Sequence, residues 1–559
     1  MVSPNEGEGQ ALLRTKSSTS SSHSSENTVN DINTSNETTN YGAVEDGSIR
    51  KVEDVKIYKS FKEIWPIFLG LTFAVFCGAL GMTIVANLTI EIGSYFHAGS
   101  LASWLGTGFL LGLTAMTPLY GRLAQVMGRK GVMLLAVNLY LIGTIMCALA
   151  PSMGFMIAAR IVAGAGSGGI LTVSAIIISD LVSLADRGMY QGGTNLLFGA
   201  GSALGAVVGG AISDKLGWRA AFWIQVPPVI FSLFLIIWKV NVDREKGEDL
   251  GGNNIWEKLK GIDWLGSILL IFSISAFSTS SSLWTSSHYK LNHPFPLGLF
   301  ISALITFPLF IWVEKKAQHP ILPLTMLSRS QPRLILFGFF LTTLSNFSRL
   351  YMQPVYLHVT RGLNGSETGL LLLPSSIVGS FSSLYAGWHM RHWREYKWFQ
   401  AIASFIPWLQ ALSLTIFWGP NTNKNELWIE MAFGALGGGI TITTLLTSLI
   451  ACVEPSELSL AISACYLSRA LGQVIGLSIS ACIQQIILFS SLSSRFPNNI
   501  ELVQKIIQEP SEILPLLDPI MNLQAKLAYL DSIRSVFIFV ILGGISLSVV
   551  CLSVRGKRL

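Results

Sequence analysis

The chain has 559 residues, of which 50% are hydrophobic and only 13% are charged. Soluble globular proteins carry about 25% charged residues, so this composition excludes an ordinary soluble domain. The formal net charge of +6 does not indicate a nucleic-acid partner, because the basic residues are gathered between long apolar stretches. The composition therefore predicts an integral membrane protein in the lipid bilayer, with no nucleic acid among its partners.

The first sixty residues differ from the rest of the chain. Residues 1–60 are rich in Ser, Thr, Asn and Glu and show almost no apolar periodicity, so a disordered cytosolic tail is expected. No basic patch followed by an apolar run occurs there, and no cleaved signal peptide is expected. Glu8, Leu12 and Leu13 fit an acidic dileucine sorting signal, which would bind a sorting adaptor.

The remainder of the chain consists of apolar stretches separated by short polar connections. A bilayer core about 30 Å thick needs about 20 apolar residues per helix. The sequence therefore predicts an all-α membrane protein with fourteen transmembrane helices. The predicted spans are Ile64-Leu88, Leu101-Ala124, Val132-Ala150, Met156-Ile178, Gly193-Ile212, Ala220-Val240, Leu265-Trp284, Pro296-Val313, Leu334-Val355, Thr368-Met390, Phe399-Trp418, Trp428-Ile450, Leu460-Ile487 and Ser535-Leu552.

The distribution of basic residues predicts the orientation. Cytosolic loops carry an excess of Lys and Arg. Most of the basic residues of the fourteen-span model fall on one side of the membrane, including Arg122, Arg129, Lys130, Arg187, Lys239, Lys315, Lys316, Arg391, Arg394, Lys397 and Arg555. That side is predicted to be the cytosol, with both termini on it.

No pattern in the sequence indicates a chemical centre. The six cysteines lie in or beside the apolar runs, without the spacing of a zinc site or of a disulfide framework. No nucleophile-base pair or phosphate-binding loop occurs in a suitable context. We therefore expect no enzyme activity, no cofactor and no metal.

The loop between the second and third predicted spans carries the first specific motif. It reads Gly-Arg-Leu-Ala-Gln-Val-Met-Gly-Arg-Lys from Gly121 to Lys130. This segment resembles the signature loop of the major facilitator superfamily, Gly-x-x-x-Asp-x-x-Gly-Arg-Lys/Arg, with Gln125 at the usual Asp position. The resemblance implies a conformational gate formed by Gly121, Gly128, Arg129 and Lys130.

The fourth predicted span contains an arginine. Arg160 and Gly164 stand in an Arg-x-x-x-Gly pattern that resembles the same superfamily. A guanidinium within a span is costly and is usually kept for a substrate, a water-filled path or a proton relay. The alternative is that Arg160, near the non-cytosolic end, extends to the interface.

The fifth predicted span has small residues at every fourth position, namely Gly201, Gly205 and Gly209, followed by Gly210. This spacing allows helix backbones to approach closely. It resembles the antiporter motif Gly-x-x-x-Gly-Pro-x-x-Gly-Gly, with Ala206 in place of proline. Helix packing is the simpler interpretation for most of these glycines.

The resemblance extends from about Ile64 to Leu559. Asp263-Trp-Leu-Gly266 and His319-Pro-Ile-Leu-Pro323 flank two extra spans in the manner of fourteen-span drug:proton antiporters. The resemblance implies the major facilitator fold, with two six-helix bundles and two additional central spans. The expected division is 1–60 tail, 61–241 N-terminal bundle, 242–332 linker with the two extra helices, and 333–559 C-terminal bundle.

The pathway for substrate and protons is less evident. The family often has an acid in the first span where this chain has Gly81. Asp180 with Arg187 is expected to fasten the cytosolic loop, and Glu91 is either a proton carrier or a solvated helix end. Candidate pathway residues are Arg160, Glu91, Asp180, Asn87, Asn195, Arg469 and Gln473.

The chain as a whole resembles fungal vacuolar basic amino acid transporters. The resemblance implies a monomeric antiporter of the vacuolar membrane that imports Lys, His and Arg in exchange for protons. Asn364, in the sequence Asn-Gly-Ser, falls in a predicted luminal loop and is a glycosylation candidate. The scarcity of acids within the spans argues against a cationic substrate. Two alternatives stay open: a plasma-membrane exporter of drugs or toxic cations, and a non-transporting nutrient sensor.

Overall fold

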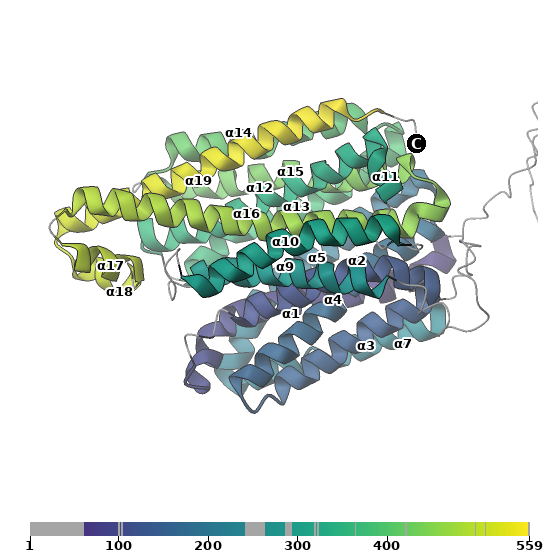
Figure 1. Cartoon of the computed structure of the whole chain (residues 1–559), viewed down its shortest axis with the longest axis horizontal. Coiled ribbons are helices and arrows are strands. Elements are labelled where there is room, and N and C mark those ends of the chain that lie inside the picture. Colours follow the sequence, from purple (N-terminus) through teal and green to yellow (C-terminus); the bar gives the residue numbers. More distant parts are fainter. Residues whose placement is uncertain are drawn as a thin grey trace, which may run out of the picture. The chain divides into compact units, whose positions relative to one another are not determined.

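The computed structural model describes residues 61–98, 101, 104–240, 263–285, 293–317, 320, 324–363, 365–419, 422–497, 499–508 and 510–556. The predicted tail, its sorting residues Glu8, Leu12 and Leu13, and the glycosylation candidate Asn364 lie outside the described residues. In the described part of the chain, every regular element is a helix (Figure 1).

The first group of helices runs from α1 to α7. Its members are α1 Phe61–Tyr95, α2 Trp104–Val126, α3 Gly128–Ala148, α4 Met153–Leu181, α5 Leu184–Leu216, α6 Trp218–Trp223 and α7 Val226–Lys239. Ser152 and Ser183 cap α4 and α5 by accepting a hydrogen bond from a backbone N–H of the first turn. Gly217, at φ 81°, ends α5 in a conformation that L side chains rarely adopt. The turns in this group are therefore set by single residues.

Two helices follow the first group. α9 Trp264–Thr285 and α10 Pro294–Lys316 pack against each other, and α9 also contacts α2 and α16. Leu270 and Ile274 of α9 form a small apolar cluster with Phe310 of α10 and Leu467 of α16. The pair correspond to the two extra predicted spans.

The second group of helices follows. Its members are α11 Leu324–Ser328, α12 Ser330–Val355, η2 Tyr356–Thr360, α13 Gly365–Trp393, α14 Lys397–Phe417, α15 Lys424–Cys452, η3 Pro455–Glu457, α16 Leu458–Arg495, α17 Ile500–Gln508, α18 Pro510–Ile513, η4 Leu514–Leu516 and α19 Pro519–Ser553. Extensive contacts link α12 to α16, α13 to α15 and α14 to α19. The domain boundaries drawn from the sequence stay a prediction.

Twelve helical segments of the described chain are long and apolar enough to cross a membrane by length and composition. The other two predicted spans correspond to α2 and α5, which are 23 and 33 residues long. α2 packs on α4 and α16, and α5 packs on α1 and α13. Because these two helices face protein more than lipid, they can carry more glycine and polar residues than their neighbours.

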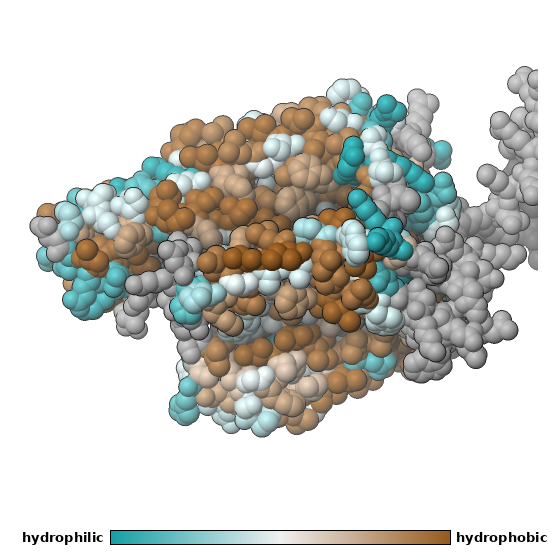
Figure 2. Space-filling view, viewed as in Figure 1, coloured by the Kyte–Doolittle hydropathy of each residue, from teal (hydrophilic) through white to brown (hydrophobic). Residues whose placement is uncertain are grey.

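Aromatic and basic side chains mark one end of the helices, which we call the termini end because α1 begins there and α19 ends there. Lysine ammonium groups lie over indole rings at three helix ends: Lys239 over Trp238, Lys316 over Trp312 and Lys397 over Trp398. Trp residues gather at membrane-water interfaces. Figure 2 shows apolar residues along the sides of the helices and hydrophilic residues gathered toward the ends.

The other end, called the opposite end, carries a small helical cap. α16 is 38 residues long, about 57 Å at 1.5 Å per residue, and so exceeds the bilayer core. Its last turns pack with α17, α18 and the start of α19 around Leu492, Val503 and Tyr529 (Figure 1). The sequence predicts a long connection at this point, between the predicted spans that end at Ile487 and begin at Ser535. The structure instead continues both helices outward, because α17 supplies an apolar face that covers them.

Candidate functional site

The signature loop connects α3 to α4 through an ion pair and α3 to α7 through a hydrogen bond. The Arg129 Nε atom donates a hydrogen bond to Asp180 Oδ2 at 2.8 Å, and both side chains are largely buried. Lys130 Nζ donates to the Ile237 carbonyl at 2.7 Å. Gly128, at φ 80°, makes the turn that only glycine adopts without strain. Of the predicted gate residues, Gly128, Arg129 and Lys130 therefore lie in or beside this turn, whereas Gly121 lies earlier, within α2.

Asp180 forms an ion pair with Arg129, a partner that the sequence did not predict. The expected pairing of Asp180 with Arg187 stays a prediction. The Arg187 Nε atom donates to the Val182 carbonyl at 3.2 Å. Gln125, at the usual Asp position, accepts a hydrogen bond from Arg122. The acid that the signature loop lacks is thus supplied by the end of α4.

The first group meets the second through α2 and α16. Ser463 Oγ lies 3.0 Å from the Thr117 carbonyl and 2.9 Å from the Pro118 carbonyl. A Cβ atom at Gly121 would overlap the Ser463 side chain. The closeness of this contact explains why position 121 is glycine, and why the gate motif begins before the loop itself.

A second contact between the groups joins α5 to α13. Cβ atoms at Gly188 and Gly192 would overlap Met390 and the backbone of Leu384. Near the helix ends, Arg391 Nε forms an ion pair with Asp186 Oδ1 at 3.0 Å, and both side chains are exposed. Both contacts between the groups therefore lie toward the termini end.

A polar layer continues this contact inward. Asn195 Nδ2 donates to Ser383 Oγ at 2.7 Å and lies 3.5 Å from Thr443 Oγ1. Gln191 Nε2 donates to Asn195 Oδ1 at 3.3 Å, and Gln191 also contacts the hydroxyl of Tyr466 on α16. The predicted pathway residue Asn195 thus lies where α5, α13, α15 and α16 converge.

The predicted pathway residues Arg469 and Gln473 follow the polar layer along α16. The Arg469 guanidinium lies over the Tyr466 ring, 4.9 Å from its centroid. The side-chain nitrogen of Gln473 is buried and makes no hydrogen bond within the described residues. Gln473 therefore offers an unused hydrogen-bond donor one turn of α16 beyond Arg469.

Arg160 is buried inside the first group. Its side chain is 2% exposed, with Nε donating to the Leu105 carbonyl at 3.2 Å and Nη1 donating to the Gly81 carbonyl at 3.3 Å. The guanidinium also lies 4.3 Å from the centroid of the Phe109 ring. This geometry differs from extension to the interface, because the charge is turned toward α1 and α2.

The place of the missing first-span acid is filled by neutral groups. A Cβ atom at Gly81 would overlap the Tyr140 hydroxyl and come within 2.6 Å of Gln225 Oε1. Tyr140 donates to the Cys77 carbonyl at 2.6 Å and lies 3.0 Å from Gln225 Oε1. The sequence shows that the acid is absent, but not that Tyr140 and Gln225 fill its place.

The other candidates of the first group lie apart from this cluster. Glu91 is exposed toward the opposite end and accepts a hydrogen bond from Ser213 Oγ at 2.5 Å. Asn87 is in α1, and its side chain is outside the described ones. Gly201, Gly205 and Gly209 press α5 against α1, and Gly210 follows in the same helix. The sequence candidates therefore do not form one compact site.

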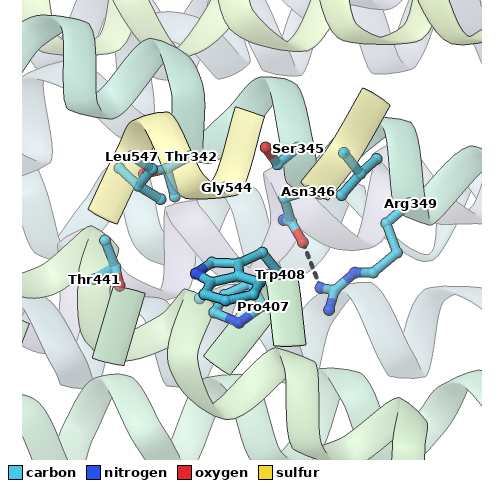
Figure 3. Close-up of a pocket in the computed structure, with 11 residues that line it drawn as sticks. Thr342, Ser345, Asn346, Arg349, Pro407, Trp408, Thr441, Gly544 and Leu547 are labelled. Carbon is cyan, nitrogen blue, oxygen red and sulfur yellow. Dashed lines mark hydrogen bonds between the residues drawn. The ribbon is translucent and has the colours of Figure 1, made fainter. Parts of the chain in front are cut away.

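The second group contains a further polar network, centred on Arg349. Arg349 is 7% exposed and donates to Asn346 Oδ1 at 2.7 Å and to Gln410 Oε1. Gln410 donates to the Glu430 carbonyl, while the Glu430 carboxylate accepts from Ser413 at 2.7 Å and from Trp418. Figure 3 shows Arg349 and Asn346 beside a cavity of about 20 Å³, which has room for about one water molecule. In the sequence, this network could be predicted only from the presence of polar residues inside the predicted spans.

Helices long and apolar enough to span a membrane, in two groups that meet through glycine, hydroxyl and amide contacts, are the architecture of a polytopic membrane protein. A model of the Major Facilitator Superfamily matches residues 71–477, more than half of the chain. This chain belongs to that superfamily.

Two curated fungal proteins and one solved structure extend this comparison. The chain is 33% identical to the multidrug resistance protein fnx1 of Schizosaccharomyces pombe, with 84% of this chain and 87% of the relative covered. It is 30% identical to vacuolar basic amino acid transporter 1 of Saccharomyces cerevisiae, covering 74% and 77%. The crystal structure of the human organic anion transporter MFSD10 shares the fold, with a TM-score of 0.56, 13% identity, and coverage of 86% and 99%.

Proposed function

We propose that this chain is a proton-coupled antiporter that imports the basic amino acids Lys, His and Arg into the vacuole. The observation that carries the proposal is the nature of the contact between the two groups. In the described residues it includes glycine approaches, hydroxyl and amide hydrogen bonds and an exposed ion pair. Each of these hydrogen bonds and the ion pair contributes little to stability. Beside them, the small side chains of Ala124 and Ala175, together with Ile176, meet apolar residues of the second group. Such a contact can open and close repeatedly, as alternating access requires.

The choice of substrate is supported by the relative named vacuolar basic amino acid transporter 1. The chain covers 77% of that protein, so the likeness extends over most of the transporter. The vacuolar membrane as the location rests on the same relative.

For proton coupling, we assign the proton-carrying role to Glu430. Its carboxylate is half-buried and accepts hydrogen bonds from the neutral donors Ser413 and Trp418. Asp180 is paired with Arg129, and Glu91 is exposed. Within the described residues no basic side chain forms an ion pair with Glu430, so a proton can bind to and leave its carboxylate without breaking an ion pair.

The proton assignment is tested by Glu430→Gln. This variant should lose uptake driven by a proton gradient but keep the exchange of labelled for unlabelled lysine. Glu426→Gln is the matched control, because Glu426 is one turn earlier in α15 and exposed. Full gradient-driven uptake by Glu430→Gln would remove the assignment.

We place the termini end in the cytosol. The Lys-Trp pairs at that end and the excess of Lys and Arg in its loops support this orientation. A glycosidase shift tests it. Glycan at Asn364 would agree with the orientation, whereas glycan at a site engineered between Arg391 and Lys397 would reverse it.

The function as a whole is tested by uptake of labelled lysine, histidine and arginine into vacuolar vesicles energised with ATP. Vesicles from cells with and without this protein are compared, each with and without a protonophore. We expect protein-dependent uptake that the protonophore abolishes. Equal uptake in both kinds of vesicle would contradict the proposal.

A second function is favoured by the relative named multidrug resistance protein, at 33% identity. In that case the chain exports drugs or toxic cations at the plasma membrane. Growth of cells lacking the protein on a panel of toxic cations, together with its location in the cell, separates the two functions.

A further inference from the structure

Three faces of α16 are occupied by neighbouring helices. Ser463 contacts α2, as described above, and Gly472 and Gly476 approach the backbone of α12 so closely that a Cβ atom would overlap it. Leu467 and Leu471 join the apolar cluster with α9 and α10. These contacts fix the rotation of α16 about its axis.

A fourth face of α16 points toward the first group, because Tyr466 on it contacts Gln191 of α5. Tyr466, Arg469 and Gln473 follow one another at intervals of three and four residues, so they lie on the same side of the helix. We call these three residues the donor face. Tyr466 contacts Gln191 of the first group, which places the start of this face directly behind the closed contact.

The donor face carries positive charge without a compensating acid. Within the described residues, no carboxylate pairs with Arg469, whose contacts are with the ring and hydroxyl of Tyr466. The Gln473 amide nitrogen is buried without a hydrogen-bond partner. Charged and polar groups inside a membrane are costly unless they bind something. The arrangement is suited to an anionic group that arrives with the substrate.

We propose that Arg469 and Gln473 bind the α-carboxylate of the transported amino acid, with Tyr466 holding the guanidinium in place. This assignment rests on the proposed amino acid transport. A guanidinium binds a carboxylate through two parallel hydrogen bonds, which fixes orientation as well as affinity. The substrate class is therefore defined by its carboxylate.

The assignment accounts for the scarcity of acids near the pathway. Lysine and arginine carry two positive charges and one negative charge at neutral pH, and all three basic amino acids carry the same negative α-carboxylate. Recognition through the negative group needs a cationic protein residue, which Arg469 supplies, and does not need an acid to face the side chain. Recognition of a bare diamine would need the opposite arrangement.

Wild-type protein provides the first test, in the vesicle uptake assay. Lysinamide and 1,5-diaminopentane keep the positive charges of lysine but lack the carboxylate. Neither should compete with labelled lysine at concentrations where unlabelled lysine competes fully. Competition by both compounds at the potency of lysine would overturn the assignment.

Variants provide the second test. Arg469→Met should raise the KM for lysine about 10- to 100-fold, because a hydrogen bond to a charged group is lost. Gln473→Leu should raise it less, and Arg469→Lys should restore part of the affinity. Arg333→Met is the matched control, since Arg333 is exposed at the start of α12. The KM of this variant for lysine should equal that of the wild type. A fluorescent tag verifies that each variant reaches the vacuole.

The outcomes separate the two proposals. If wild-type vesicles take up none of the three amino acids, the proposed function fails and this assignment fails with it. If the wild type transports lysine and a correctly located Arg469→Met has the same KM, only the carboxylate assignment is overturned. The competition assay decides the matter even if the variants do not fold.

Discussion

Helix α5 carries two rows of small residues that serve different contacts. Gly188, Gly192 and Gly199 face α13 in the second group, whereas Gly201, Gly205 and Gly209 face α1 in the first group. We call them the outer row and the inner row. The inner row is the glycine motif that the sequence analysis identified, and it joins helices of one group. The outer row joins the two groups, and it has no motif of its own.

The difference between the two rows shows that small residues alone do not identify a contact that opens and closes during transport. In lipid, packing of small residues drives any close association of helices. What distinguishes the outer row is its surroundings: the polar layer of Asn195, Ser383 and Thr443 lies within it, and an exposed ion pair lies at its end. The inner row instead meets the backbone and side chains of α1.

The largest effect is expected from Gly205→Val in the inner row. The new Cβ atom would overlap Thr83 and lie 2.6 Å from the Leu80 carbonyl. Overpacking of this kind costs about 1–3 kcal/mol of folding free energy. We expect a lower melting temperature and less folded protein in size-exclusion chromatography. The control is Gly298→Val, because nothing lies within 4 Å of a Cβ atom there. Equal loss in both variants would contradict the distinction.

Gly192→Leu in the outer row should leave the fold intact but prevent closure. Its Cβ atom would lie 2.6 Å from the Ser383 carbonyl on the other group. A cysteine at Ala124, which is fully buried beside the second group, reports on the contact in a background without the native cysteines. We expect faster alkylation of that cysteine and little lysine uptake. An unchanged alkylation rate would contradict the prediction, because it would mean that the contact made by the outer row does not open.

The sequence predicts the fold better than the site, for a physical reason. Apolar stretches of bilayer length and the distribution of Lys and Arg mark the helices, because lipid acts on each helix separately. The partner of Arg129 and the groups that fill the space at Gly81 depend on residues 51 and 59 positions away or more, which no local pattern specifies. Arg469 and Gln473 could be proposed because polar groups within a span are costly wherever they point.

Ser463→Ala tests the α2 to α16 contact, with a smaller expected effect. The substitution removes the hydroxyl that reaches the Thr117 and Pro118 carbonyls. A hydrogen bond contributes about 1 kcal/mol, which corresponds to roughly a fivefold shift toward the separated state. Alkylation of the cysteine at Ala124 measures this shift. Ser546→Ala is the control, because the Ser546 hydroxyl donates to the Leu542 carbonyl of the same helix, α19. A shift of equal size in the control would contradict the role of Ser463.

The smallest effect is expected at the ion pair of Asp186 and Arg391. An exposed pair contributes about 0–1 kcal/mol, so Arg391→Gln should change the alkylation rate about twofold at most. Asp186→Asn should change it more, since Asp186 also accepts a hydrogen bond from Ser183 at the start of α5. Raising the salt concentration from about 0.1 M to about 1 M shortens the Debye length from about 10 Å to about 3 Å, and should remove the difference between Arg391→Gln and the wild type. A difference that persists in high salt would mean that Arg391 holds the groups together by packing, in which case this end of the outer row behaves like the inner row.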